Sequence, residues 1–420
     1  MIFAGGKILP DSERSAVLGR LEEDISQTLG GPPLAAETVL DALEALAAEL
    51  DSGALDGLIA RYAPPGAREE LDRVRPQISR KTLEDRLRLE LGDLGGPRPF
   101  GRAEVRPLGV LLHIAPGNMA GLPAFTAVEG LLTGNLNLVK LPHGDKGLTL
   151  AVFQKLTELE PKLAPWLYAF DVPSRDTASL KRLAALAGGI VTWGGDGAIT
   201  AMRKLAPPGC KLIEWGHRLS FAYLSDWAGL DLSTLARHIL RTGGLLCSSC
   251  QVIYLDTEYL AVGEKFCKDF LPVLERAAAS RYQAPGQAAQ GALYTREAVL
   301  EQIVDRAASD DLVFAGRCCS LVLRRDMELE LSHLHGNVLV KRLPRKDLLP
   351  VLGRQRGRLQ TAGLLCPERL REELAALLAR AGVNRITIPG HMSDTFPGEA
   401  HDGEYPLRRY VRVVDVENNF

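Results

Sequence analysis

Short, almost wholly apolar runs alternate with stretches of helical periodicity between residues 109 and 193, and this alternation limits the fold more than any other feature. The apolar runs cover residues 109–114, 136–141, 167–172 and 189–193. Strands that are apolar throughout are typical of a parallel sheet that helices cover on both faces. Sheets of this kind bind ligands beyond the carboxyl ends of their strands. We therefore predict an α/β fold with a ligand site at that edge.

The rest of the chain predicts further helices and a second α/β block. Residues 17–91 carry apolar stripes at helical spacing, and the second block follows residue 226. A chain of 420 residues is too long for one ordinary core, so two domains or one composite unit are expected. The stretch APGQ at residues 284–287 is interpreted as a surface loop.

Composition narrows the class of protein. The chain has 50 basic and 52 acidic residues, which does not favour nucleic acid or an anionic membrane as a partner. No apolar run approaches the ~20 residues that cross a bilayer. The apolar stretch near the N-terminus is too short for a signal peptide. Seven scattered cysteines suit reduced thiols. We predict a cytoplasmic protein without a membrane span or metal site.

Basic residues gather in two places, residues 341–358 and residues 408–409. A solvated face is the ordinary interpretation of such clusters. A phosphate-rich ligand is the alternative.

The segment GGLLCSSCQ at residues 243–251 joins a predicted helix to a predicted strand. A cysteine on a turn of small residues can present its sulfur to a ligand, and a thiolate forms acyl thioesters. Cys247 and Cys250 also form a C-x-x-C pair, which is typical of redox or metal sites. No second C-x-x-C and no H-x-x-x-H of zinc spacing accompanies it. A nucleophile, a dithiol and a buried structural cysteine remain open.

Two further segments carry polar groups or glycines at strand ends. TWGGDG at residues 192–197 could bring backbone N–H groups to a pyrophosphate, or its glycines could serve only the turn. Glu214 follows apolar residues, where a carboxylate either pairs with a cation or has its pKa raised for acid/base work. His113 lies within an apolar run and is predicted to be a core histidine.

Five segments in order resemble the aldehyde dehydrogenase superfamily. They are residues 107–118 ("P-x-G … P-W-N"), 134–140 ("G-N-x-x-V-x-K"), 192–195 (the cofactor turn), 214–218 ("E-L-G-G-K") and Cys247, the family nucleophile. CSS at residues 247–249, without the usual "G-Q" before the cysteine, and the ending HDGEYPL at 401–407 resemble the acyl-CoA reductase branch. That branch includes the LuxC-like fatty-acid reductase of bacterial bioluminescence.

The resemblance implies an aldehyde-dehydrogenase-like fold with a Rossmann-type cofactor domain, an α/β catalytic domain and an active site in the cleft between them. It assigns residues 1–225 to N-terminal helices and nicotinamide-cofactor binding. Residues 226–390 form the catalytic domain with the cysteine nucleophile, and residues 391–420 serve oligomerisation or return to the cofactor domain.

The same resemblance assigns roles to single residues. Cys247 attacks the acyl carbonyl, and the Asn118 side chain helps to hold the oxyanion. Glu214 serves as a proton shuttle, or as the water-activating base in hydrolytic members. The cofactor-binding residues are Pro116, Lys140, His143, Trp193, Gly194, Gly195 and Trp215. His143 stands where NAD-preferring relatives often have Glu, and Lys146 is near, so NADPH is favoured over NADH.

The predicted reaction is reduction of an acyl thioester, with acyl-CoA as the favoured substrate and a fatty acyl group, to the aldehyde. CoA is then the leaving group, and an acyl-carrier protein or an acyl-protein synthetase is the alternative donor. A homo-oligomer, dimer or tetramer, is expected from the superfamily. One alternative is a hydrolytic aldehyde dehydrogenase with Glu214 as base. The other is a non-catalytic or redox protein that uses Cys247 and Cys250 as a dithiol.

Overall fold

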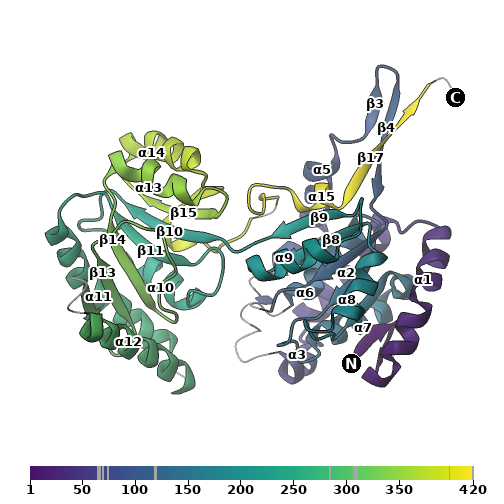
Figure 1. The fold of residues 1–420 in the computed structure, drawn as a ribbon, viewed down its shortest axis with the longest axis horizontal. Helices are drawn as coiled ribbons and strands as arrows, with labels where there is room; N and C mark the ends of the chain where they lie inside the picture. The colour runs from purple at the N-terminus through teal and green to yellow at the C-terminus, as the bar shows by residue number, and fades with distance from the viewer. Residues whose placement is uncertain are drawn as a thin grey trace. The chain divides into compact units, whose positions relative to one another are not determined.

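The computed structural model of the chain describes residues 1–63, 68, 71–72, 75–117, 121–282, 285–305, 311–396 and 398–418 (Figure 1). The chain divides into two compact units. Unit 1 comprises Met1–Gly216 and Thr395–Phe420, and unit 2 comprises His217–Asp394. The sequence placed the corresponding divisions at residues 225/226 and 390/391. The roles assigned to the parts remain predictions.

Unit 1 contains a seven-stranded sheet in the order β2-β1-β7-β6-β5-β8-β9. Strands β5 to β9 are parallel to one another, whereas β1 pairs antiparallel with β2 and β7. The strands are β1 (Ile2–Ala4), β2 (Lys7–Leu9), β5 (Val110–Ile114), β6 (Leu136–Lys140), β7 (Leu167–Phe170), β8 (Gly189–Trp193) and β9 (Lys211–Trp215). The apolar runs of the sequence therefore form the predicted parallel sheet.

Helices cover this sheet because alternate residues of its strands face opposite sides. Leu112 belongs to the larger core of unit 1, and its neighbour Leu111 belongs to a smaller core that includes Tyr410 of the C-terminal segment. The helices are α1 (Arg14–Gly30), α2 (Ala36–Asp51), α3 (Asp56–Tyr62), α5 (Arg80–Leu91), α6 (Leu122–Leu132), α7 (Leu148–Leu159), α8 (Thr177–Ala185) and α9 (Asp196–Leu205).

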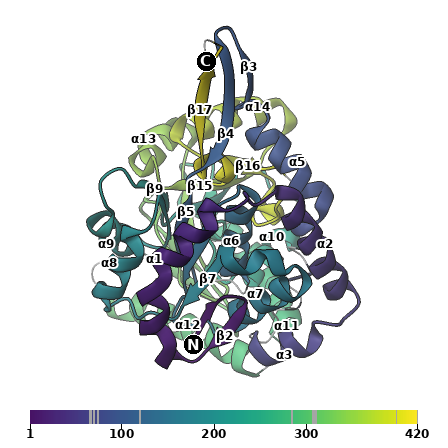
Figure 2. The same cartoon turned by 90° about the vertical axis from the view of Figure 1, so that its right-hand side faces the viewer.

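The C-terminal segment returns to unit 1 and joins a three-stranded antiparallel sheet. In it β17 (Val411–Glu417) pairs with β4 (Gly101–Pro107), which pairs with β3 (Gly96–Arg98). This arm extends away from the helices of unit 1 (Figures 1 and 2). The short helix α15 (Pro406–Arg409) precedes β17, and the backbone N–H of Leu407 donates to the buried Glu90 carboxylate, 2.8 Å away.

Unit 2 contains a second seven-stranded sheet, in the order β12-β13-β14-β11-β10-β15-β16. Its strands are parallel except for β12. They are β10 (Leu219–Leu224), β11 (Cys250–Leu255), β12 (Leu312–Ala315), β13 (Ser320–Arg324), β14 (Asn337–Arg342), β15 (Leu359–Leu365) and β16 (Arg385–Thr387). The helices are α10 (Ser233–Thr242), α11 (Leu260–Arg281), α12 (Pro285–Asp305), α13 (Leu348–Leu352) and α14 (Glu368–Ala381).

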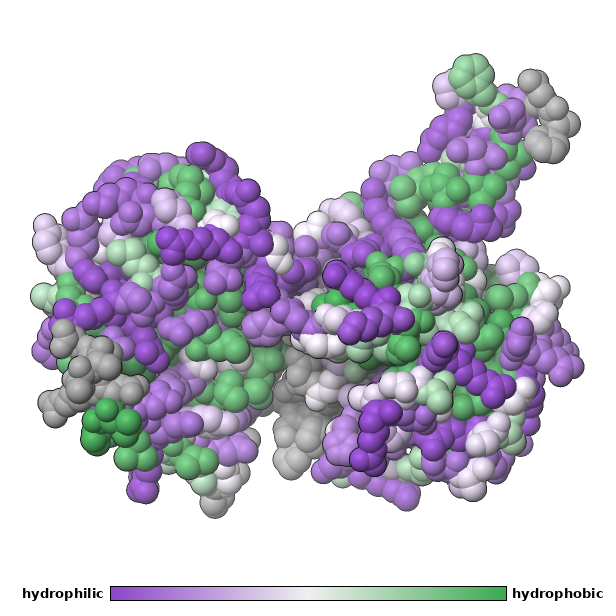
Figure 3. All heavy atoms as spheres, in the orientation of Figure 1, coloured by the Kyte–Doolittle hydropathy of each residue, from purple (hydrophilic) through white to green (hydrophobic). Residues whose placement is uncertain are grey.

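Two surface properties of the helices are relevant to partners. On α12 the apolar side chains of Leu293, Leu300 and Val304 are all more than half exposed. In Figure 3, green atoms gather in the region of unit 2 where Figure 1 labels α12. Among the helices that the structure describes, none combines the length and the apolar character needed to cross a bilayer.

Candidate active site

The carboxyl edge of the unit 1 sheet brings together residues that are far apart in the sequence. Strand register places Ile114 beside Lys140, and Trp193 beside Trp215. The N–H of Ala115 donates to the carbonyl of Lys140 at 3.1 Å, so the turn that contains Pro116 begins next to that lysine. Pro116, Lys140, Trp193 and Trp215 therefore lie at the strand ends where the sequence predicted a ligand site.

Lys140 places a cation at this edge. Its side chain is mostly buried, and Nζ donates to Ser174 Oγ at 3.4 Å. Burial lowers the pKa of Lys140, and the nearby Asp171 carboxylate acts in the opposite direction. An ammonium carries three donors, so Lys140 can bind a further acceptor such as a ribose hydroxyl. This donor set fits a dinucleotide.

The first glycine of the turn from β8 to α9, Gly194, has a backbone conformation that favours glycine. Gly194 has a φ of +150°, and a Cβ there would lie 3.2 Å from the Ala198 Cβ. Gly195 caps α9, whose first turn carries the carboxylate of Asp196. The turn can offer backbone N–H groups to a pyrophosphate, although Asp196 places a negative charge nearby.

Trp193 and Trp215 form an aromatic cluster with the C-terminal segment. Their ring centroids are 5.6 Å apart, and the His401 ring lies 5.1 Å from Trp193 and 4.8 Å from Trp215. The Arg409 guanidinium lies over Trp215 at 5.5 Å. Trp215 is 3% exposed, whereas Trp193 is only partly buried. Trp193 therefore has the more accessible surface for a ligand.

Two predicted site residues remain, His143 and Asn118. His143 and Lys146 are exposed on the loop after β6, where both side chains can meet an anionic ligand. Asn118, the predicted oxyanion donor, lies outside the described residues.

Glu214, the residue before the last of β9, forms a two-point ion pair. Its carboxylate oxygens accept from Arg203 Nε at 2.5 Å and Nη2 at 2.6 Å. Hydrogen bonding to Glu214 raises the pKa of Arg203. Of the two possibilities that the sequence left open for this carboxylate, the structure shows pairing with an arginine.

Cys247 lies in unit 2, on the turn between α10 and β11. Gly243 and Gly244 have φ of +57° and +79°, left-handed conformations that favour glycine, and they end α10 and begin the turn. The Ser249 hydroxyl accepts from the N–H of Leu246 at 2.9 Å and holds the turn from within. Cys247 as a residue is half-buried.

Cys250 is buried, whereas Cys247 is half-buried. Cys250 begins β11, is 3% exposed, and burial raises the pKa of its thiol to about 12. All seven cysteines lie in the described part of the chain, and all are reduced. A thiol held in the protonated form inside a core is a poor nucleophile.

Several polar side chains that support the Cys247 turn were not found from the sequence. The Gln251 amide donates to the carbonyl of Gly244 at 3.0 Å and accepts from Ser332. Ser248 Oγ and Ser393 Oγ lie 2.7 Å apart. Ser332 and Ser393 are too far along the chain from the turn for any local sequence signal to link them.

His238 of α10 is also buried in unit 2. It is 1% exposed, and burial lowers its pKa to about 3. The imidazole is therefore neutral at ordinary pH and adds no positive charge to this end of α10.

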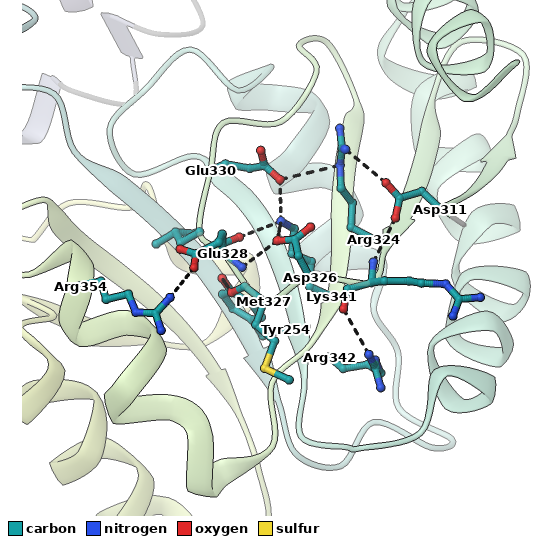
Figure 4. Close-up of polar contacts among 12 residues, drawn as sticks. Tyr254, Asp311, Arg324, Asp326, Met327, Glu328, Glu330, Lys341, Arg342 and Arg354 are labelled. Carbon is teal, nitrogen blue, oxygen red and sulfur yellow. Dashed lines mark hydrogen bonds and ion pairs between the residues drawn. The ribbon is translucent and has the colours of Figure 1, made fainter. Parts of the chain in front are cut away.

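In the basic cluster that begins at Lys341, Lys341 and Arg354 form ion pairs with carboxylates that precede the cluster in the chain (Figure 4). The fully buried Lys341 ammonium donates to Asp326 at 2.6 Å, to the carbonyl of Glu328 at 2.8 Å and to Glu330 at 2.5 Å. Arg354 pairs with Glu328 at 2.6 Å. Lys341 therefore anchors a loop of unit 2, and its ammonium is not exposed to a phosphate-rich ligand.

The second basic cluster is paired as well. Arg408 forms an ion pair with Asp93 at 2.6 Å, and Arg409 pairs with Glu404. Arg409 also donates to the carbonyl of Leu212 at 3.0 Å. These arginines fasten the C-terminal segment to the body of unit 1.

Comparison with known proteins places these features in a family context. The family model described as acyl-CoA reductase (LuxC) matches residues 33–413. The long-chain acyl-protein thioester reductase of Vibrio harveyi is 24% identical over 383 residues, which cover 86% of this chain and 76% of that protein. The protein of the same name from Aliivibrio fischeri is 22% identical over 361 residues, which cover 81% and 72%.

Solved structures share the fold along almost the whole chain. Aldehyde dehydrogenase 21 from Physcomitrella patens has a TM-score of 0.70 at 14% identity and covers 98% of this chain and 92% of its own. The Δ-pyrroline-5-carboxylate dehydrogenase from Mycobacterium tuberculosis has a TM-score of 0.69 at 14% identity, covering 100% and 89%. At these identities the likeness shows the fold alone. It confirms the predicted aldehyde-dehydrogenase-like α/β fold.

Proposed function

We propose that this chain, which belongs to the acyl-CoA reductase (LuxC) family, reduces an acyl thioester to the aldehyde with NADPH through an acyl-Cys247 intermediate. The observation that carries the proposal is the contrast between the two cysteines of the C-x-x-C pair. Cys247 is half-buried on a glycine-rich turn, and Cys250 is sealed in the core with its pKa raised to about 12. The relatives named long-chain acyl-protein thioester reductase support the substrate class.

The chemistry assigns one step to the thiolate of Cys247. Its sulfur attacks the acyl carbonyl carbon, the bond from that carbon to the donor sulfur breaks, and the donor thiol leaves after taking a proton. NADPH, when bound, supplies the hydride that reduces the acyl carbon. The bond from Cys247 sulfur to that carbon then breaks, the aldehyde leaves, and the thiolate is regenerated. Asn118 is expected to donate to the oxyanion, where one donor contributes a factor of about 10²–10³.

The cofactor side of the proposal rests on the carboxyl edge of the unit 1 sheet. Lys140 has donor capacity for a ribose, and the turn with Gly194 and Gly195 would offer backbone N–H groups to a pyrophosphate. Trp193 and Pro116 line the same edge. Trp215 stays a predicted cofactor-binding residue, and its indole packs against Trp193 and His401.

The donor and the assembly state are further parts of the proposal. Acyl-CoA, an acyl-carrier protein or an acyl-protein synthetase would present the same thioester carbon to Cys247. The antiparallel arm of β3, β4 and β17 is the element we assign to a homo-oligomeric contact. We assign the protein to the cytoplasm because its seven scattered cysteines suit reduced thiols.

A pulse of long-chain acyl-CoA without NADPH tests the covalent step. Peptide mass spectrometry should find the acyl mass on Cys247, and later addition of NADPH should remove it with release of aldehyde. Cys247→Ala should lose both the adduct and turnover, and Cys250→Ala is the matched control that should keep both. An adduct on Cys250, or turnover by Cys247→Ala, would overturn the assignment. No adduct together with a reversible Cys247–Cys250 disulfide would favour the dithiol alternative.

A further inference from the structure

Strand β10 has an irregular register at Ser220, close to the Cys247 turn. On one side Ser220 pairs with Cys250 and Phe221 with Val252, so one residue of β11 has no partner. On the other side Leu219 pairs with Leu359 and Phe221 with Ala362, so β15 also carries an extra residue. Irregularities of this kind leave backbone groups without ladder bonds and are frequent beside functional sites.

The Ser220 hydroxyl binds two backbone groups at this irregularity. It donates to the carbonyl of Cys247 at 2.6 Å and accepts from the N–H of Thr361 at 3.0 Å. Ser220 is fully buried. A hydroxyl has one donor and can accept at the same time, so a single side chain satisfies both groups.

The bond to the Cys247 carbonyl differs from the other bonds of the turn. Ser249, within the turn, binds the N–H of Leu246. Gln251, two residues after Ser249, binds the carbonyl of Gly244. Ser220 reaches the turn from a different strand and binds the cysteine itself. Because the peptide group is planar, holding that carbonyl also fixes the direction of the next N–H and restricts the rotation about the Cα–C bond of Cys247. The rotation sets how the side chain and the next N–H are directed.

We propose that Ser220 is a positioning residue for Cys247, holding the nucleophile in the orientation that acyl transfer requires. The inference rests on the proposed function, since it assumes that Cys247 is the acylated residue. It goes further by assigning a role to a buried serine that has no reactive contact of its own. A displacement of about 1 Å at a reacting atom can cost on the order of 10²-fold in rate, so loss of one such bond is measurable.

The test is the single-turnover rate at which acyl-CoA acylates Cys247, measured by quenched-flow mass spectrometry. Ser220→Ala removes the hydroxyl, and we expect the acylation rate to fall by about tenfold or more. The KM for NADPH should stay unchanged, because no cofactor contact is altered. Ser220→Thr keeps a hydroxyl on a β-branched residue that strands accept, and it should restore most of the rate.

Tyr223→Phe is the matched control on the same strand. Tyr223 is also fully buried, and its hydroxyl donates to a backbone carbonyl, that of Leu343, at 3.1 Å. This variant should lose thermal stability comparably while keeping the wild-type acylation rate. A Ser220→Ala rate equal to that of Tyr223→Phe would overturn the positioning role and leave Ser220 as a purely structural residue.

The experiment separates a wrong positioning role from a wrong proposed function and from a variant that does not fold. If wild-type Cys247 forms no adduct, the proposed function fails, whereas an intact wild-type adduct with an unaffected Ser220→Ala defeats only the positioning role. Should Ser220→Ala not fold, Ser220→Cys, which keeps the volume but donates weakly, takes its place. The expected result for it is an acylation rate between those of Ser220→Thr and Cys247→Ala, and a wild-type rate overturns the proposal.

Discussion

Arg203 Nε and Nη2 lie 2.5 and 2.6 Å from the two carboxylate oxygens of Glu214. A general base must accept a proton from water, and both oxygens of this carboxylate already accept hydrogen bonds from a guanidinium. In the hydrolytic alternative Glu214 would have to accept that proton while it is paired with Arg203, or leave the pair. The pairing therefore favours a reductase over an enzyme that releases acid.

Glu214→Gln separates the two functions. We expect the variant to keep most of its acyl-CoA reduction, measured as NADPH oxidation with trapped aldehyde, because the step does not need a free carboxylate. Cys247→Ala, assayed in parallel, should be inactive. If Glu214→Gln loses as much activity as Cys247→Ala, Glu214 takes part in the chemistry and the hydrolytic alternative returns.

His113 predicts a pH dependence for the stability of unit 1. It is fully buried beside Asn137 Oδ1 at 2.9 Å, and burial lowers its pKa from 6.5 to about 4. The unfolded chain therefore takes up the proton first as the pH falls. The free energy of unfolding that depends on neutral His113 is complete above pH 6.5 and is lost progressively as the pH falls from 6.5 to about 4. Between pH 6.5 and pH 5 the loss is about 2 kcal/mol.

Urea unfolding at pH 7 and pH 5 measures this effect. His113→Gln keeps a donor for Asn137 but does not titrate, so its stability should fall less between the two pH values than that of the wild type. Tryptophan fluorescence in a Trp227→Phe background reports on unit 1, which holds the other tryptophans, Trp166, Trp193 and Trp215. Equal losses for both proteins would show that His113 is not held neutral in the fold.

The sequence predicted the parallel sheet of unit 1 because strands buried on both faces are apolar throughout, and that property is local. It did not predict α12, since Pro285 and Gly286 were interpreted as a loop, whereas proline is accepted in the first turn of a helix. The bond from Ser220 to Cys247 was also missed. It joins residues of two strands through a register irregularity, and nothing in the local pattern records that register.

Charge near His143 should decide between the two nicotinamide cofactors. His143 is exposed on the loop after β6 with Lys146 close by, and a carboxylate there would repel a 2′-phosphate. His143→Glu should raise the KM for NADPH by about tenfold and leave the KM for NADH nearly unchanged. Gln27→Glu, which adds the same charge to the exposed face of α1, is the control. Equal changes for both cofactors would remove His143 from the cofactor site.

Arg86 holds two buried carboxylates in unit 1, and its removal should be the most destabilising of these changes. It donates to Glu90 at 2.9 Å and to Glu129 at 2.7 Å, and all three side chains are less than a tenth exposed. Arg86→Met leaves both carboxylates buried without a cation, a loss of about 3–5 kcal/mol. Burial raises the pKa of Glu129, and the charge of Arg86 acts against this rise. Without Arg86, the Glu129 carboxyl therefore binds a proton more readily in the folded state. The folded state then loses stability as the pH rises, and the defect should be smaller at pH 5 than at pH 8.

Lys341→Met is the matched comparison for Arg86→Met, because it also replaces a buried cation by an apolar chain. The carboxylates it leaves, Asp326 and Glu330, are 46% and 44% exposed and can be hydrated again. The loss should therefore be only about 1–3 kcal/mol and should depend little on pH. Both variants are compared with the wild type by urea unfolding at the two pH values. A larger loss in Lys341→Met than in Arg86→Met would mean that burial of the remaining carboxylates does not set the cost.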